Sequence, residues 1–265
     1  MTSNNDAVEK RIILSIRNLN KSFGHIQALK AISLDIHEGE VLALVGDNGA
    51  GKSTLIKILS GVYRPDDGQI YLKEKSFKRL TPAQAIMNGI TTVYQDLALV
   101  DCRDVACNVF LGREPTRARF FIDKKKMQSG TSALLAKLKI HAPVLTSPAS
   151  ILSGGQRQGI AIARAINQGG RILILDEPTA AMGVAETSQV LELVGSLGRQ
   201  GYAVILVSHN LHQVFSVADR IIVMRNGQLI ADLLTEETCS SEVMELITGI
   251  RESAAYAAKD VARSL

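Results

Sequence analysis

The stretch LVGDNGAGKST, Leu44 to Thr54, carries three glycines, a lysine and two hydroxyl residues directly after an apolar run. It fits the pattern G-x-x-x-x-G-K-[ST], in which Gly46 and Gly51 are the glycines and Lys52 and Ser53 follow. Glycine has no Cβ and reaches positive φ freely, so a ligand can touch the main chain there. Successive N–H groups of such a loop point inward and form an anion site. We therefore expect a phosphate-binding loop rather than a glycine-rich turn that matches by chance.

The flanks of this loop support the same interpretation. The apolar run 41–45 predicts a buried strand before it, and the helical spacing of apolar residues in 54–61 predicts a helix after it. A helix that begins near Lys52 would add the positive end of its dipole to the phosphate site. Lys52 would reach the β- and γ-phosphates, and the Ser53 hydroxyl would ligate Mg²⁺.

Length and composition limit the class of protein. With 265 residues and a net charge of +4, we expect one domain, or one domain with a subdomain, and a sizeable core. The chain shows neither eighteen consecutive apolar residues nor the apolar core of a secretory signal. Three cysteines without a C-x-x-C pair argue against a disulfide framework and suit a reducing cytosol. The lysine run 124–126 is interpreted as a solvated face, and no nucleic-acid partner is expected.

The order of the segments predicts an α/β fold with a largely parallel core sheet. Two further segments, 65–72 and 225–232, place Asp-Gly or Asn-Gly beside strand-like residues and predict hairpins in an antiparallel piece. The apolar, β-branched runs that predict the core strands are 41–45, 172–175, 203–207 and 220–224.

The domain organisation follows from these segments. Residues of about 97–165 are predicted to be mostly helical, as an insertion into a single nucleotide-binding domain that covers 8–250. The last residues, 251–265, are predicted to form a helical tail.

A second candidate group of residues ends the strand in RILILDEPTA. Asp176 and Glu177 follow this strand, and the carboxyl ends of strands are where α/β sheets bind ligands. Asp176 can hold Mg²⁺ through water, and Glu177 can orient or deprotonate an attacking water. Alone, the pair would also fit a helix-capping aspartate. Together with the phosphate loop it indicates hydrolysis of a phosphoanhydride, which needs placement and charge neutralisation more than covalent chemistry.

The segment LSGGQRQ, Leu152 to Gln158, places a serine and two glycines before an apolar-periodic helix. We call it the signature segment. An exposed helix N-terminus of this kind is a second anion site. One γ-phosphate hardly needs two such sites from one chain, so this one would serve a nucleotide held by another copy. An ordinary serine N-cap followed by glycines explains the segment equally well.

In this order and spacing, GDNGAGKST, LSGGQRQ and ILILDEPTA resemble the nucleotide-binding subunit of an ABC transporter over residues 10–250. The resemblance implies the ABC cassette of the P-loop NTPase fold, with ATP and Mg²⁺ as cofactors. It implies a head-to-tail dimer of two copies, in which each ATP lies between one copy's phosphate loop and the other's signature segment.

The resemblance also assigns roles to single residues. It implies that Phe23 stacks on adenine, that Gln95 senses Mg²⁺ and the lytic water, and that His209 contacts the γ-phosphate. Without it, Phe23 could be a core residue and His209 a satisfied histidine at a strand end. The implied nucleotide contacts are Phe23, Gly46, Asp47, Asn48, Gly49, Ala50, Gly51, Lys52, Ser53, Thr54, Ser153, Gly154, Gly155 and Gln156; the implied metal site is Ser53, Gln95 and Asp176; the catalytic residues are Glu177, His209 and Gln95.

Three segments narrow the resemblance to the bacterial simple-sugar importers of the ribose, xylose and fructose type: YQDLALV (94–100), NVFLGRE (108–114) and EPTAAMGV (177–184). The last is close to the single-cassette branch. This implies ATP-driven sugar uptake through a separate membrane permease, with the chain peripheral at the cytoplasmic face of the inner membrane. A periplasmic sugar-binding protein would be linked only through the permease. The alternatives are an ABC ATPase of a non-sugar transporter, and a soluble cassette that acts on nucleic acid or ribosomes.

Two glycines depart from expectation. Gly183 stands where most ABC cassettes have an aspartate, which leaves the contact between the two copies without that carboxylate. Gly159 lies inside the helix after the signature segment, where glycine costs about 1 kcal/mol relative to alanine. Close packing of another helix is one reason to keep a glycine there.

Overall fold

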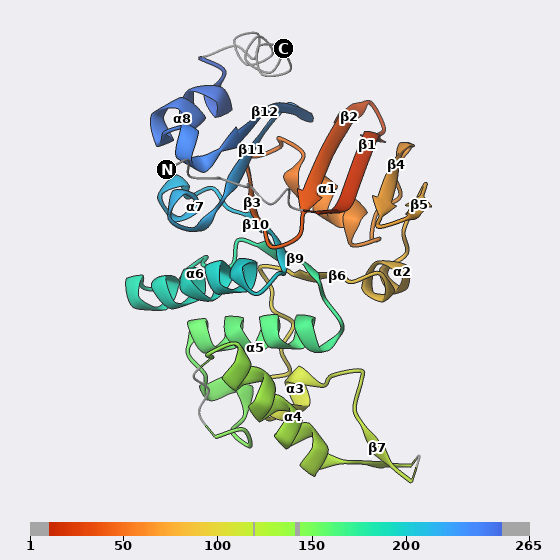
Figure 1. Ribbon diagram of the computed structural model, residues 1–265, viewed down its shortest axis with the longest axis vertical. Coiled ribbons are helices and arrows are strands. Elements are labelled where there is room, and N and C mark those ends of the chain that lie inside the picture. The colour runs from red at the N-terminus through yellow and green to blue at the C-terminus, as the bar shows by residue number, and fades with distance from the viewer. Residues whose placement is uncertain (1–10, 119, 141–143, 251–265) are drawn as a thin grey trace, which may run out of the picture.

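The computed structural model describes residues 11–118, 120–140 and 144–250. The tail predicted for 251–265 and residues 8–10 of the predicted domain lie outside the described residues. Figure 1 shows a mixed core sheet with helices on it, a second sheet beside it, and a helical part below. No helix in the described ranges is long and apolar enough to span a bilayer.

The core sheet has the strand order β12-β11-β3-β10-β9-β6, and all neighbours are parallel except the pair of β11 and β12. Every residue of the central strands β3 and β10 is buried, which is why they are continuous apolar runs. The predicted α/β fold with a largely parallel core sheet is confirmed. The strands are β3 (Val41–Gly46), β6 (Ile90–Val93), β9 (Ile172–Asp176), β10 (Ala203–Val207), β11 (Arg220–Arg225) and β12 (Gln228–Leu234).

Alternate side chains of these strands enter two different cores, because successive residues of a strand point to opposite faces. Ala43 and Val45 pack in one core with residues of α5 (Gly154–Asn167) and α6 (Val184–Arg199). Leu42 and Leu44 pack in the other with α1 (Lys52–Leu59) and the second sheet. The remaining helices around the sheet are α2 (Pro82–Met87), α7 (Leu211–Val217) and α8 (Ser240–Thr248), with a 3-10 turn, η2 (Thr235–Glu237).

The second sheet is antiparallel, in the order β2-β1-β4-β5, and confirms the predicted antiparallel piece. The turn predicted at Asp67-Gly68 is wrong: both residues lie inside β4, which pairs with β1 and forms its hairpin with β5. The turn predicted at Asn226-Gly227 joins β11 to β12, with positive φ at both residues as a two-residue hairpin requires. The strands of this sheet are β1 (Ile12–Phe23), β2 (Ile26–His37), β4 (Asp67–Leu72) and β5 (Lys75–Phe77).

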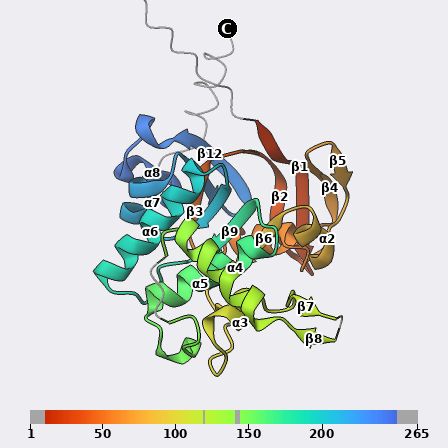
Figure 2. The ribbon, with the colours of Figure 1, turned by 60° about the horizontal axis from the view of Figure 1, so that its bottom comes forward.

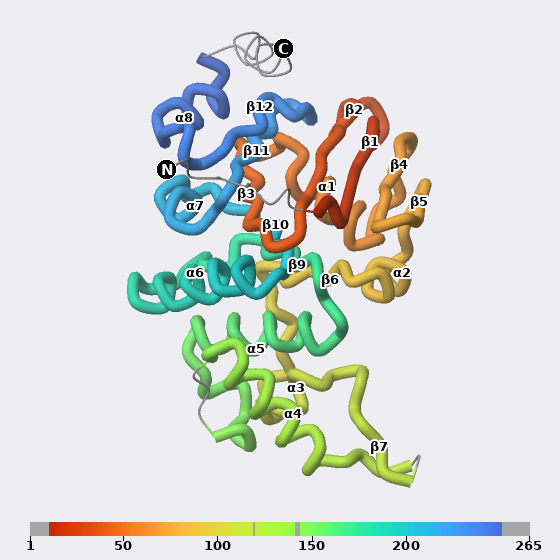
Figure 3. The backbone as a smooth tube through the Cα atoms, viewed as in Figure 1, coloured from red at the N-terminus to blue at the C-terminus, as the bar shows by residue number. Residues whose placement is uncertain are grey.

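The segment between β6 and α5 leaves the sheet and returns to it, as the tube in Figure 3 shows. It contains α3 (Val105–Val109), α4 (Lys124–Lys137) and a 3-10 turn, η1 (Ala149–Ile151). It also contains a two-stranded ribbon that the sequence did not predict, β7 (Thr116–Arg117) paired with β8 (Phe121–Ile122). We call this part, together with α5, the helical subdomain.

Gly159 is buried in α5 and faces Ile140, which follows α4. A Cβ at Gly159 would lie only 3.0 Å from Cγ2 of Ile140. The glycine therefore allows the segment after α4 to pack directly on α5.

Candidate active site

The phosphate loop, residues 46–54, connects the end of β3 to the start of α1 and is shaped by two glycines. Gly46 has φ 150° and Gly51 has φ 103°. A Cβ at Gly46 would lie 2.2 Å from the carbonyl oxygen of Met224, and one at Gly51 would lie 2.6 Å from that of Ala28. Both positions therefore require glycine, because the backbones of β11 and β2 pass directly behind the loop.

Lys52 holds this loop from within. Its ammonium group donates hydrogen bonds to the carbonyl oxygens of Gly46, at 2.6 Å, and Asp47, at 3.0 Å. Burial lowers the pKa of Lys52, and the negative charges of Glu177, Asp47 and Asp176 counter that decrease. A partly desolvated cation in a loop of backbone amides fits an anionic ligand. A bound triphosphate would place negative charge beside the Lys52 ammonium group and so compensate for its burial.

The two carboxylates at the end of β9 lie in different environments. Burial raises the pKa of Asp176, the charge of Glu177 raises it further, and the charges of Lys57 and Lys52 lower it. A buried carboxylate of this kind is stabilised by a nearby cation. Ser53 and Gln95 line the same cavity as Asp176 and add neutral oxygen atoms. This set of oxygen donors suits Mg²⁺, which is bound through one or two carboxylates together with substrate phosphates.

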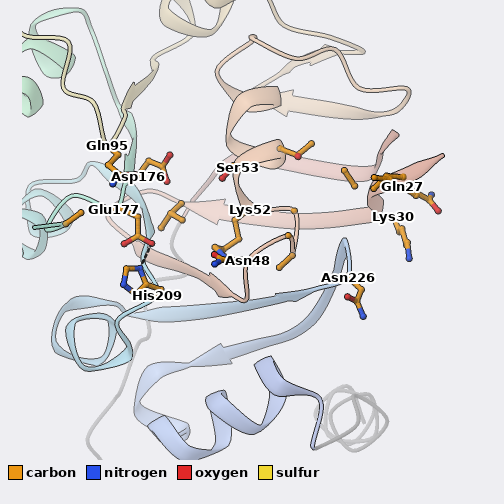
Figure 4. A pocket seen from close by; sticks show the side chains of 18 residues that line it. Gln27, Lys30, Asn48, Lys52, Ser53, Gln95, Asp176, Glu177, His209 and Asn226 are labelled. Carbon is orange, nitrogen blue, oxygen red and sulfur yellow. Dashed lines mark hydrogen bonds and ion pairs between the residues drawn. The ribbon is translucent and has the colours of Figure 1, made fainter. Parts of the chain in front are cut away.

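Glu177 is paired with His209. Nδ1 of the histidine lies 2.9 Å from Oε1 of the glutamate, across the ends of β9 and β10 (Figure 4). The Glu177 side chain is 20% exposed and that of His209 is 78% exposed. Glu177 has φ 50°, and its N–H donates to the carbonyl of Val207 at 2.9 Å. Residues held in this left-handed region cluster at functional sites, where the surrounding structure fixes them.

A cavity of about 890 Å³ brings these groups together from four separate parts of the sequence. It is lined by residues 48–54 of the phosphate loop and by Gln95, Asp176, Glu177 and His209. Figure 4 shows Lys52 facing the Glu177 and His209 pair across this space. Such a cavity can bind a phosphorylated ligand and place a water molecule beside a carboxylate base.

Apart from the signature segment, three predicted nucleotide contacts lie outside the cavity lining: Gly46, Asp47 and Phe23. Gly46 and Asp47 act through their carbonyl groups on Lys52. Phe23, at the end of β1, is exposed, so the alternative of a core phenylalanine is wrong. Its ring meets that of Tyr63 edge-on at 5.3 Å, and the ammonium group of Lys21 lies 5.2 Å from its centroid. An exposed aromatic ring in this position is available for stacking.

The cavity also contains polar residues that the sequence did not indicate. Gln27 and Lys30 come from β2, and Asn226 comes from the turn between β11 and β12 (Figure 4). The Lys30 N–H donates to the carbonyl of Gly227 at 2.7 Å, which ties the two sheets together at this point. No motif marks these residues; only the topology brings them beside the loop.

The signature segment does not reach this cavity within one chain. Ser153 is the N-cap of α5: its Oγ accepts from the N–H of Gln156, and Oε1 of Gln156 accepts from the N–H of Ser153. This reciprocal pair is a capping box. The N-cap interpretation therefore holds inside the chain, and none of residues 152–158 lines the cavity beside the chain's own phosphate loop.

Gly183 is the N-cap of α6, with φ −70°, ψ 167° and no side-chain hydrogen bond to the helix. A Cβ there would meet open space. We expect Gly183→Asp to raise the free energy of unfolding by a few tenths of a kcal/mol, because aspartate accepts from the first-turn N–H groups and suits the helix dipole. Thermal unfolding measures this. Gly183→Ala is the control, since alanine offers no acceptor; an equal rise in both variants would contradict the capping argument.

Comparison with known proteins agrees with this geometry. The family model described as ABC transporter matches residues 29–180. The chain is 44% identical to a xylose/arabinose import ATP-binding protein of Sulfolobus acidocaldarius, over 89% of this chain and 94% of that protein. It is 41% identical to a fructose import ATP-binding protein of Rhizobium meliloti, over 91% and 95%.

Among solved structures, a nucleotide-free ATP-binding cassette from an ABC transporter is similar, with a TM-score of 0.77 and 26% identity. The similarity covers 90% of this chain and 96% of that one. The chain therefore belongs to the ABC transporter family as an ATP-binding cassette.

Proposed function

We propose that this chain is the ATP-hydrolysing subunit that drives uptake of a simple sugar through a separate membrane permease. The observation that carries the ATPase part is the cavity in which Lys52 faces Asp176 and Glu177. The sugar as transported solute is supported by two relatives of the chain, a xylose/arabinose import ATP-binding protein and a fructose import ATP-binding protein.

Nucleotide binding would use the main chain of the phosphate loop and the first turn of α1. Lys52 would exchange the carbonyl oxygens of Gly46 and Asp47 for oxygens of the β- and γ-phosphates. Ser53, Asp176 and Gln95 would hold Mg²⁺, whose charge neutralises the phosphates when it is bound. Phe23 would stack on adenine, which is worth about 1–3 kcal/mol for a base on an aromatic ring.

Hydrolysis would depend on Glu177. Its carboxylate would accept a hydrogen bond from the attacking water and so orient that water in line with the γ-phosphorus. The same carboxylate would then take the proton of the water. His209 would hold the other side of this carboxylate through Nδ1, 2.9 Å from Oε1, and in the doubly protonated form of its ring would also donate from Nε2 to the γ-phosphate. The two residues would therefore act as a unit.

A second copy would complete the site. Ser153 and the first N–H groups of α5 would bind the γ-phosphate held by the partner's phosphate loop, in a head-to-tail dimer. Gln95 lies just after β6, where the chain leaves the core sheet for the helical subdomain. ATP-driven pairing would move this junction and so drive the permease, provided that the paired and open states differ in nucleotide affinity. The chain would then lie at the cytoplasmic face of the inner membrane.

Purification of the tagged chain from solubilised membranes tests the transport role. We expect a multi-span permease to co-purify, and the reconstituted complex to hydrolyse ATP faster when a sugar-loaded binding protein is present. Recovery of ribosomes or DNA in its place would contradict the proposal and favour a soluble cassette. If only a non-sugar solute stimulates hydrolysis, the chain is still the ATPase of a transporter, but the proposal that the transported solute is a sugar is wrong.

A further inference from the structure

The ribbon of β7 and β8 carries an exposed apolar tip. Phe120, Phe121 and Ile122 are 87%, 72% and 56% exposed. Figures 1 and 2 show the ribbon projecting past α3 and α4, at the end of the helical subdomain away from α8. Neighbouring apolar residues this exposed mark a contact with a partner or a membrane.

Basic residues surround this tip. Arg113 and Arg117 are exposed before it, and the lysines 124–126 are exposed after it. None of them has an ion pair within the described part of the chain. Glu114 and Asp123, the carboxylates of this segment, accept hydrogen bonds from backbone N–H groups. The five exposed basic residues outnumber these two carboxylates, so the described surface around the apolar tip carries net positive charge.

The lysine cluster is not explained by the stability of its helix. The lysines 124–126 form the first turn of α4, where the N-cap Asp123 is the single acidic residue against three cations. Positive charge at a helix N-terminus opposes the helix dipole. An anionic surface outside the protein would remove this repulsion.

The shape of the ribbon indicates what kind of surface covers it. Each strand has two residues, and the side chains of Phe121 and Ile122 alternate between its faces. Phe120 extends the tip beyond them. A flat protein surface can cover one face of such a ribbon, whereas a fluid layer surrounds both faces and the tip.

We propose that this ribbon inserts into the headgroup layer of an anionic bilayer. The aromatic tip enters the boundary with the acyl chains, while the arginines and lysines meet anionic headgroups. The contact is separate from the nucleotide cavity, none of whose lining residues lies on the ribbon. It would tether the cassette to the membrane independently of ATP.

Flotation of the full chain with vesicles tests this proposal without any permease. We expect binding to phosphatidylcholine vesicles that contain about one third phosphatidylglycerol, weaker binding at high salt, and little binding to phosphatidylcholine alone. Changing the lysines 124–126 to glutamine should lower partitioning about 100-fold, since each basic residue contributes roughly fivefold. Phe120→Ser with Phe121→Ser should lower it at least ~10-fold. ATP hydrolysis in solution should not change in either variant.

Matched controls change the same chemistry elsewhere on the surface. Met87→Ser removes another apolar side chain, 81% exposed, and glutamine at Lys75, Lys78 and Arg79 removes the same charge. Absence of wild-type binding, or equal loss in the controls, overturns the proposal. Loss of binding by the ribbon variants only when the vesicles contain the permease would also overturn it, in favour of a protein partner.

Discussion

Glu177→Gln is expected to lower the rate of ATP hydrolysis at least ~100-fold, the usual contribution of a general base. Glutamine keeps the shape of the side chain but cannot take a proton from water. ATP affinity should stay close to that of the wild type, because the phosphate loop, Ser53 and Asp176 are unchanged. ATP would then hold two copies together for longer than in the wild type.

Steady-state phosphate release and ATP binding, measured on the same preparation, separate the two effects. Glu192→Gln is the matched control, since it neutralises an exposed carboxylate on α6. Wild-type hydrolysis by Glu177→Gln would show that another group activates the water. An equal loss of binding and turnover would assign Glu177 to nucleotide binding.

Ser153→Asp is expected to lower ATP-driven pairing and hydrolysis roughly 100-fold, because like charges brought together in an interface cost several kcal/mol. Aspartate is as good an N-cap as serine, so α5 should keep its stability. The change therefore tests the charge at the start of α5 and not the cap. Thr81→Asp is the matched control, because Thr81 caps α2 in the same reciprocal way with Gln84.

Mixing variants tests the head-to-tail arrangement itself. Ser153→Asp and Lys52→Ala should each be nearly inactive alone. In a mixed pair, one site carries both changes and the other carries neither. Random pairing of equal amounts then restores about a quarter of the wild-type sites. No recovery on mixing would contradict a site shared between two copies, and full activity of Ser153→Asp alone would contradict any role of the signature segment.

The sequence predicts the structure best where a local motif is compatible with a single backbone conformation. The spacing of Gly46, Gly51 and Lys52 requires a strand, a loop and a helix in that order, and a Cβ at either glycine collides with backbone in the structure. The paired acids follow a strand whose apolar run is unbroken, so their place at the sheet edge follows directly.

Prediction fails where one local signal fits two structures. Asp67-Gly68 indicated a turn because such pairs favour positive φ, and Gly68 does have φ 102°. The same dihedral occurs where β4 meets the irregular register of β1, between Arg17 and Asn20. Lys30 and Asn226 reach the cavity only because the two sheets meet there, and no local sequence pattern predicts which residues lie at that junction.

The two hydrogen bonds that Lys52 donates to backbone carbonyl groups have a consequence for nucleotide selectivity. Because the chain supplies its own acceptors, the loop keeps its form before any ligand arrives, and little conformational entropy remains to be lost on association. Preorganisation of this kind favours every nucleotide that carries a β-phosphate. Discrimination between the triphosphate and the diphosphate must then come from the opposite wall, where Glu177 and His209 lie, and from the second copy.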